Sequence, residues 1–137
     1  MKLTEDKVFV DTNILVYSYS NNEPEKQTIA RNLIADNDSF ISTQVLQELT
    51  NTVIRKFKYS YKDAIIALNE SIQNNNIHVN TEITITQACK IAERYGFSFY
   101  DSLIIAAAIE CSCLFLYSED LQHNQIINDT LKIVNPF

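Results

Sequence analysis

Four isolated acidic residues stand beside apolar runs in this 137-residue sequence, namely Asp11, Glu48, Asp101 and Asp120. Each of two short apolar runs of strand type ends in a polar tip that carries one acid, and each of two apolar helical segments carries one acid in its opening turns. If the four carboxylates converge, their repulsion is substantial, because two unit charges ~4 Å apart cost about 4 kcal/mol at an effective dielectric near 20. A hard divalent cation would offset this repulsion. Oxygen-only ligands select Mg²⁺ or Mn²⁺.

Each acid also has an ordinary structural explanation. Asp11 is credible as a turn residue at a strand end, Asp120 as the start of a helical turn, and Glu48 as a solvent-facing helix position. Asp101 lies three residues after Ser98, which is a common capping arrangement at a helix start: Ser98 accepts from a first-turn amide and Asp101 reaches back. Taken singly, each acid is therefore explained at least as well by its structural role as by a metal site.

The elements that must position these acids alternate along the chain. Short apolar runs predict strands at residues 8–10, 40–41, 77–79, 114–117 and 132–134, and apolar residues at helical spacing predict the helices between them. Such alternation indicates an α/β fold with a parallel sheet that is covered on both faces. Ligands bind at the carboxyl ends of the strands in these sheets, where Asp11 and Asp120 are expected. The sequence shows no linker or repeat, so we expect one domain over residues 1–137.

The net charge of −6 opposes generic binding to a nucleic-acid backbone, so a nucleic-acid role requires a local basic patch or bound cations. Four of the 11 Lys and Arg residues fall within one eight-residue stretch, at Arg55, Lys56, Lys58 and Lys62. This stretch is either a solvated helix end or an RNA-contacting patch. His78 and His123 are expected to be polar loop or edge residues, because hard oxygen chemistry does not require them.

Three cysteines, Cys89, Cys111 and Cys113, form no even framework and no CxxC pair, which is typical of a reduced, cytoplasmic protein. The first residues lack the apolar segment of a signal peptide. The longest apolar run, residues 103–109, is far shorter than the ~18 residues that a membrane span requires. We therefore expect a soluble protein with no membrane contact.

At its acidic residues the sequence resembles the PIN-domain family and, within it, the VapC-type toxins of type II toxin-antitoxin pairs. The resemblance rests on four segments that each contain one of the acids, residues 9–15, 42–48, 99–102 and 117–123, and on the closing residues 133–137. Family members commonly have Gly where this chain has Asn124. Because Asn tolerates left-handed backbone well, we expect that turn to persist.

The resemblance implies a three-layer αβα fold with a central, mostly parallel sheet of four to five short strands. It implies that Asp11, Glu48, Asp101 and Asp120 hold Mg²⁺ or Mn²⁺ in an endoribonuclease, with Glu48 bound to the metal either directly or through water. Asn13 and Ser118 would orient carboxylates or water. The expected products carry 5′-phosphate and 3′-hydroxyl ends, and the expected partners are the RNA substrate, a cognate antitoxin and a second copy of the chain.

Three other functions are weighed against this one. The chain would be a PIN-like RNA-processing nuclease if no antitoxin pairs with it, or a catalytically silent PIN-like interaction module if substrate access is lost. A phosphatase of the haloacid-dehalogenase type also has an Asp after its first strand. That family expects a second acid two residues later, where this chain has Asn13.

Overall fold

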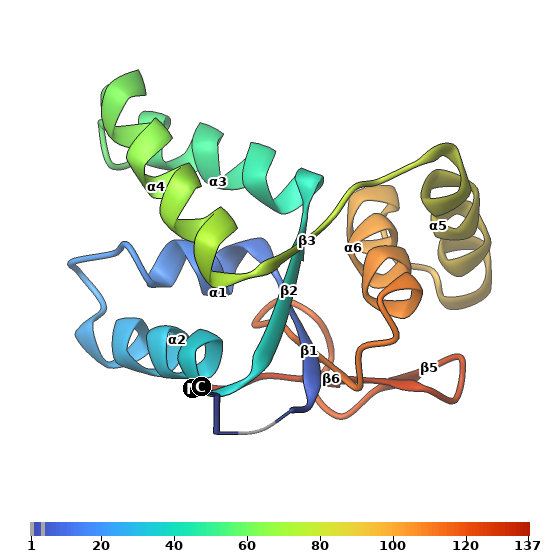
Figure 1. Cartoon of the computed structure of the whole chain (residues 1–137). Helices are drawn as coiled ribbons and strands as arrows, with labels where there is room; N and C mark the ends of the chain where they lie inside the picture. Colours follow the sequence, from blue (N-terminus) through green and yellow to red (C-terminus); the bar gives the residue numbers. More distant parts are fainter. Residues whose placement is uncertain (1, 4) are drawn as a thin grey trace.

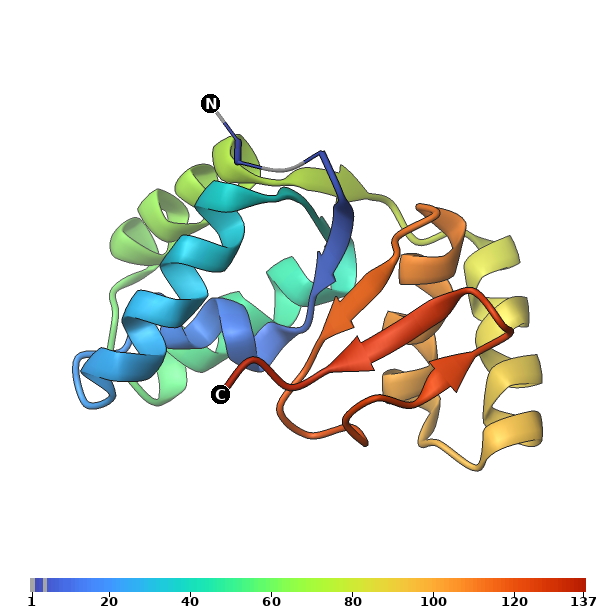
Figure 2. The same ribbon diagram turned by 90° about the horizontal axis from the view of Figure 1, so that it is seen from below.

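The computed structural model describes residues 2, 3 and 5–137, and its centre is one six-stranded sheet. The strands lie in the order β3-β2-β1-β4-β6-β5, which Figures 1 and 2 show from two directions. Their bounds are β1 Lys7–Val10, β2 Asp38–Ser42, β3 Asn76–His78, β4 Phe115–Tyr117, β5 Ile126–Ile127 and β6 Leu131–Val134. All neighbouring strands are parallel except β5, which pairs antiparallel with β6.

Six helices cover the sheet within the described residues. They are α1 Thr12–Tyr17, α2 Pro24–Asp36, α3 Thr43–Arg55, α4 Tyr61–Asn74, α5 Glu82–Tyr95 and α6 Phe99–Glu110. In both ribbon views α5 and α6 lie on one side of the sheet and α1 to α4 lie on the other (Figures 1 and 2). The predicted α/β fold with a mostly parallel central sheet is therefore confirmed.

The sheet has one strand more than the four to five that were expected. The additional strand is β5, which is two residues long and pairs with β6 through Ile127 and Leu131. Two residues are too few to show alternation, so an apolar pattern cannot distinguish such a strand from a loop.

The core lies between the sheet and the helices on both faces. The central strand β1 buries Val8, Phe9 and Val10 completely, as expected for a strand that is covered on both sides. Helix α6 buries every residue from Ser102 to Ala108, so it is apolar all round and its axis is fixed by packing. Full burial of a side chain such as Phe9 contributes on the order of 2 kcal/mol to the free energy of folding. The rigid core that results positions the residues at the end of β1 and at the start of α6.

Six of the described residues have left-handed backbone, and Gly96 and Asn124 are two of them. Gly96, the only glycine, ends α5 with φ 81°, where a side chain would be strained. Asn124 adopts φ 70°, so the left-handed turn expected at this position is present. Across the described part of the chain, no helix has the length and hydropathy that spanning a membrane requires.

The strand order reverses at β1. The chain proceeds from β1 to β2 and β3 in one direction, and β4 then returns to the opposite side of β1. In open α/β sheets the crevice for a ligand forms at the carboxyl ends of the strands that flank such a reversal. Asp11 follows β1 directly and Ser118 follows β4 directly, so both lie at this crevice.

Candidate metal centre

Asp11 links the carboxyl ends of β1 and β4. Its backbone N–H donates to the Tyr117 carbonyl at 3.0 Å, which continues the β1–β4 ladder by one residue. One carboxylate oxygen accepts from the Thr12 amide at 2.7 Å, and the other accepts from Ser118 Oγ at 2.9 Å. Both oxygens of Asp11 are therefore held before any ligand binds.

Glu48 reaches the same region from α3. Thr12 Oγ1 donates to Glu48 Oε1 at 2.6 Å, and Thr12 is only 8% exposed. Sequence reasoning gave Thr12 no role, because helical periodicity does not say which neighbouring helix a face of α1 meets. Its position directly after Asp11, at the start of a short helix, was the one feature of the sequence that placed Thr12 near the acids.

Asp101 and Asp120 complete the set of acids. The backbone N–H of Asp101 donates to Ser98 Oγ at 3.2 Å, so Asp101 lies in the capped first turn of α6. Asp120 is exposed on the loop after β4, and Asn13 Nδ2 donates to its carboxylate. Asn13 and Ser118 thus each donate a hydrogen bond to one of the four acids.

The local electrostatics show that three of these acids share one environment. Burial raises the pKa of Asp11 from 3.8 to about 6, against the hydrogen bonds from Ser118 and Thr12, which lower it. The negative charges of Asp101 and Glu48 raise the Asp11 pKa further. A cation beside Asp11 would offset both the cost of burying the negative charge and the repulsion from the neighbouring carboxylates.

The donor set fits a hard divalent cation that keeps most of its water. It consists of carboxylate oxygens, which Mg²⁺ and Mn²⁺ prefer. In the part of the chain that the structure describes, no group of three or more His, Cys, Asp or Glu side chains forms a metal cage. Mg²⁺ needs no such cage, because it is typically bound by one or two protein carboxylates, with water and substrate phosphate completing its octahedron.

Comparison with known families supplies the next observation. The family model described as PIN domain matches residues 8–127. The chain belongs to the PIN-domain family. No curated protein matches this PIN-domain sequence.

Solved structures share the fold along most of their length. A toxin-antitoxin complex from Klebsiella pneumoniae has a TM-score of 0.69 at 18% identity, with 95% of this chain and 98% of that chain covered. VapBC2 from Rickettsia felis, bound to a promoter DNA fragment, has a TM-score of 0.68 at 20% identity, with 94% and 99% covered. VapC20 from Mycobacterium tuberculosis, a sarcin-ricin loop cleaving toxin, has a TM-score of 0.67 at 20% identity, with 82% and 89% covered. This PIN domain therefore has the fold of toxins from toxin-antitoxin systems.

The four predicted RNA-binding residues lie apart from the acids. They occupy the end of α3, the turn after it and the start of α4, and all are exposed: Arg55, Lys56, Lys58 and Lys62. Arg55 follows Glu48 by seven residues on α3, which places it roughly 10 Å further along the helix axis. The basic stretch therefore extends from the helix that carries Glu48 and does not enter the acid cluster.

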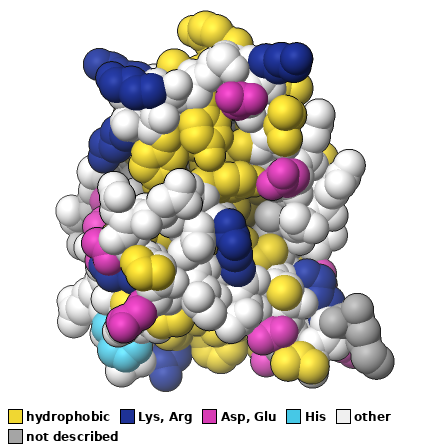
Figure 3. All heavy atoms as spheres, turned by 90° about the vertical axis from the view of Figure 1, so that its left-hand side faces the viewer, with side chains coloured by type: hydrophobic (Ala, Val, Ile, Leu, Met, Phe, Trp, Pro, Cys, Tyr) yellow, Lys and Arg dark blue, Asp and Glu magenta, His cyan; other side chains and the backbone are white. Residues whose placement is uncertain are grey.

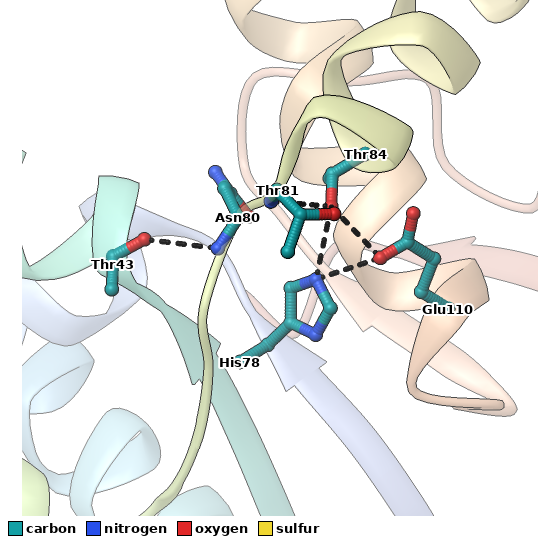
Figure 4. Close-up of polar contacts among 6 residues, drawn as sticks. All are labelled: Thr43, His78, Asn80, Thr81, Thr84 and Glu110. Atoms are coloured by element: carbon teal, nitrogen blue, oxygen red, sulfur yellow. Dashed lines mark hydrogen bonds and ion pairs between the residues drawn. The ribbon is translucent and has the colours of Figure 1, made fainter.

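The two histidines make structural contacts, as the sequence suggested. His78 Nε2 lies 2.9 Å from Glu110 Oε2, and Thr84 Oγ1 donates to the same carboxylate oxygen at 2.9 Å. Figure 4 shows this cluster joining the end of β3 to α5 and α6. His123 Nδ1 accepts from the backbone N–H of Asn135 at 2.9 Å.

Proposed function

We propose that this PIN domain is a metal-dependent endoribonuclease that hydrolyses RNA phosphodiester bonds and serves as the toxin of a type II toxin-antitoxin pair. The observation that carries the proposal is the half-buried Asp11 carboxylate at the strand-order reversal, with the charges of Asp101 and Glu48 acting on it. Hydrogen bonds from Ser118 and the Thr12 amide stabilise the ionised Asp11 against burial and this repulsion, and a folded protein has no structural need for such an arrangement.

Asp11, Glu48, Asp101 and Asp120 would hold Mg²⁺ or Mn²⁺. When bound, the ion polarises a phosphoryl oxygen, lowers the pKa of a bound water and neutralises charge that develops during in-line displacement. The residues of the chain orient the carboxylates that would bind the ion. Ser118 and the Thr12 amide fix both oxygens of Asp11, and the Thr12 side chain fixes Glu48. No side-chain nucleophile is required.

The electrostatics of Asp11 suit work near neutral pH. With a pKa of about 6, Asp11 is mostly ionised at pH 7 and therefore ready to bind a cation. A bound cation would favour the ionised form further and would move the acid limb of activity below pH 6.

A surface of α4 supports the expectation of protein partners. Its apolar residues Tyr61, Ile65 and Ile66 are 74%, 56% and 51% exposed. Figure 3 shows apolar side chains gathered in the upper part of the face where α2 and α4 lie, with both basic and acidic side chains around them. Contiguous apolar surface of this kind marks interaction sites in soluble proteins. We propose that a second copy of the chain covers it, as expected from the sequence, and that a cognate antitoxin blocks the acid site.

Cleavage of RNA by the purified protein tests the proposed function. Structured RNA is incubated with Mg²⁺ or Mn²⁺, with EDTA, and with the Asp101→Asn variant in parallel. We expect cleavage with either metal and none with EDTA or the variant. Folded protein that cleaves no RNA would favour the silent interaction module. Co-expression with a short DNA-binding protein encoded nearby tests the toxin assignment, because an antitoxin should restore the growth of cells that express this chain.

A further inference from the structure

The loop after β4 holds two of the contacts that organise the acid site. Ser118 donates to Asp11, and Asp120 accepts from Asn13. Glu119 lies between them in sequence but has a different partner: its Oε1 accepts from Lys26 Nζ at 2.7 Å. Lys26 lies on α2, an element that supplies none of the four acids.

The ammonium group of Lys26 lies against two aromatic rings. It lies 4.7 Å from the ring centroid of Tyr17 and 5.1 Å from that of Phe137. The two rings contact each other edge to face, with centroids 5.2 Å apart, and Lys26 Nζ also donates to the Tyr17 hydroxyl at 3.3 Å. Cation–π contacts of this geometry are attractive, and they fix the position of an otherwise flexible lysine.

The ion pair is partly shielded from water. The Lys26 and Glu119 side chains are 28% and 27% exposed, so solvent and salt screen their attraction less than that of a fully exposed pair. The cluster joins the end of α1, the first turn of α2, the loop after β4 and the segment after β6. It therefore ties the loop that carries Ser118 and Asp120 to three separate parts of the chain.

We propose that Lys26 is a positioning residue for the candidate metal centre: it holds Glu119 and thereby keeps the neighbouring Asp120 beside Asn13. This inference rests on the proposed nuclease function. Asp120 is exposed on an irregular loop and has one side-chain hydrogen bond among the described residues, from Asn13, so a further contact is needed to fix it. Phe137 acts through Lys26, Tyr17 contacts both Lys26 and Glu119, and none of the three contacts the reacting atoms.

The test compares Lys26→Ala, Glu119→Gln and the double variant with wild-type protein. Lys90→Ala is the matched control, since Lys90 is an exposed lysine on α5, away from the cluster. We expect kcat to fall about tenfold in each single variant, as for other residues that orient metal-binding carboxylates. The double variant should lose no more than either single variant, because both substitutions break one contact. KM for RNA should stay constant, and Lys26→Arg should restore most of the activity.

Two measurements separate this inference from the proposed function. Amide hydrogen exchange of the peptide that covers residues 118–121 should accelerate several-fold in Lys26→Ala and Glu119→Gln but not in Lys90→Ala. Binding of Mn²⁺ alone should weaken in the same two variants by about tenfold. If wild-type protein cleaves no RNA, the proposed function fails, and the exchange data still decide whether Lys26 positions the loop.

Two results would overturn the inference. Unchanged exchange over residues 118–121 in both single variants would show that the loop keeps its position without Lys26. A rise in KM for Lys26→Ala, with Glu119→Gln behaving as wild type, would mean that Lys26 binds the RNA phosphate directly.

Discussion

Replacing Asp11 by Asn should stabilise the metal-free protein at neutral pH while it destroys the candidate metal centre. Burial raises the pKa of Asp11 from 3.8 to about 6, so the folded state disfavours its ionised form. About two units at 1.36 kcal/mol each give an upper limit near 3 kcal/mol for this cost. Asn removes the charge and retains an oxygen for the Thr12 amide, since Asn and Asp cap helices about equally well.

The expected gain is smaller than this limit, because the variant loses a charge-assisted bond from Ser118 and Asp11 is only partly buried. A gain of about 1–2 kcal/mol corresponds to a rise in Tm of roughly 3–8 °C for a chain of this size. The measurement is thermal or urea unfolding in EDTA. Asp129→Asn is the control, because Asp129 is exposed and its left-handed backbone suits Asn.

The difference in stability between Asp11→Asn and the wild type should depend on pH in a definite direction. Between pH 3.8 and about 6 the folded state binds more protons at Asp11 than the unfolded state, so the stability of the wild type falls as pH rises through this window. Above about pH 6 the free-energy cost of keeping Asp11 ionised in the folded state no longer changes with pH. The advantage of Asp11→Asn should therefore be full at pH 8 and should shrink as pH falls from 6 towards 4. A variant that is less stable than wild type at pH 8, or an advantage independent of pH, would refute the reasoning.

Three further outcomes follow from the structure. Thr12→Val should lower kcat by about tenfold with little change in Tm, because Glu48 loses its hydrogen bond while the buried volume is kept; unchanged kcat would remove Thr12 from the site. Neutralising Lys56 and Lys58 together should weaken RNA binding and reduce its dependence on salt, as filter binding at several salt concentrations measures; the same slope as wild type would contradict an RNA-contacting patch. Gly96→Ala should lower stability by about 1 kcal/mol through backbone strain at φ 81° alone, since nothing lies within 4 Å of the added Cβ. A neutral result in urea unfolding would show that the α5 cap relaxes.

The sequence predicted the sheet and the order of its elements because their patterns are local. Apolar runs identified β1 and β4, and a parallel sheet places the ends of those strands at one edge, which brings Asp11 near Ser118. A first-turn acid in an apolar segment placed Asp101 correctly at the start of α6.

The remaining features depend on contacts between elements, which periodicity does not encode. The bond from Thr12 to Glu48 needs α1 to pack on α3, and the pair of Lys26 with Glu119 joins residues that lie 93 positions apart. Periodicity shows that a helix has an apolar face but does not name its neighbour. Strand β5 escaped prediction for another reason, since its pairing with β6 and not its composition makes it a strand.

Cleavage of RNA by wild-type protein and by Asp101→Asn, with the folding of both verified by thermal melts, decides whether these acids form the centre of a metal-dependent ribonuclease. Asp101 lies in the capped first turn of a buried helix, so the isosteric change should leave the fold intact. We expect the wild type to cleave RNA with Mg²⁺ or Mn²⁺, EDTA to abolish this cleavage, and the folded variant to lack it. Cleavage by the variant at the wild-type rate, or cleavage that persists in EDTA, would contradict a metal-dependent nuclease built on these acids.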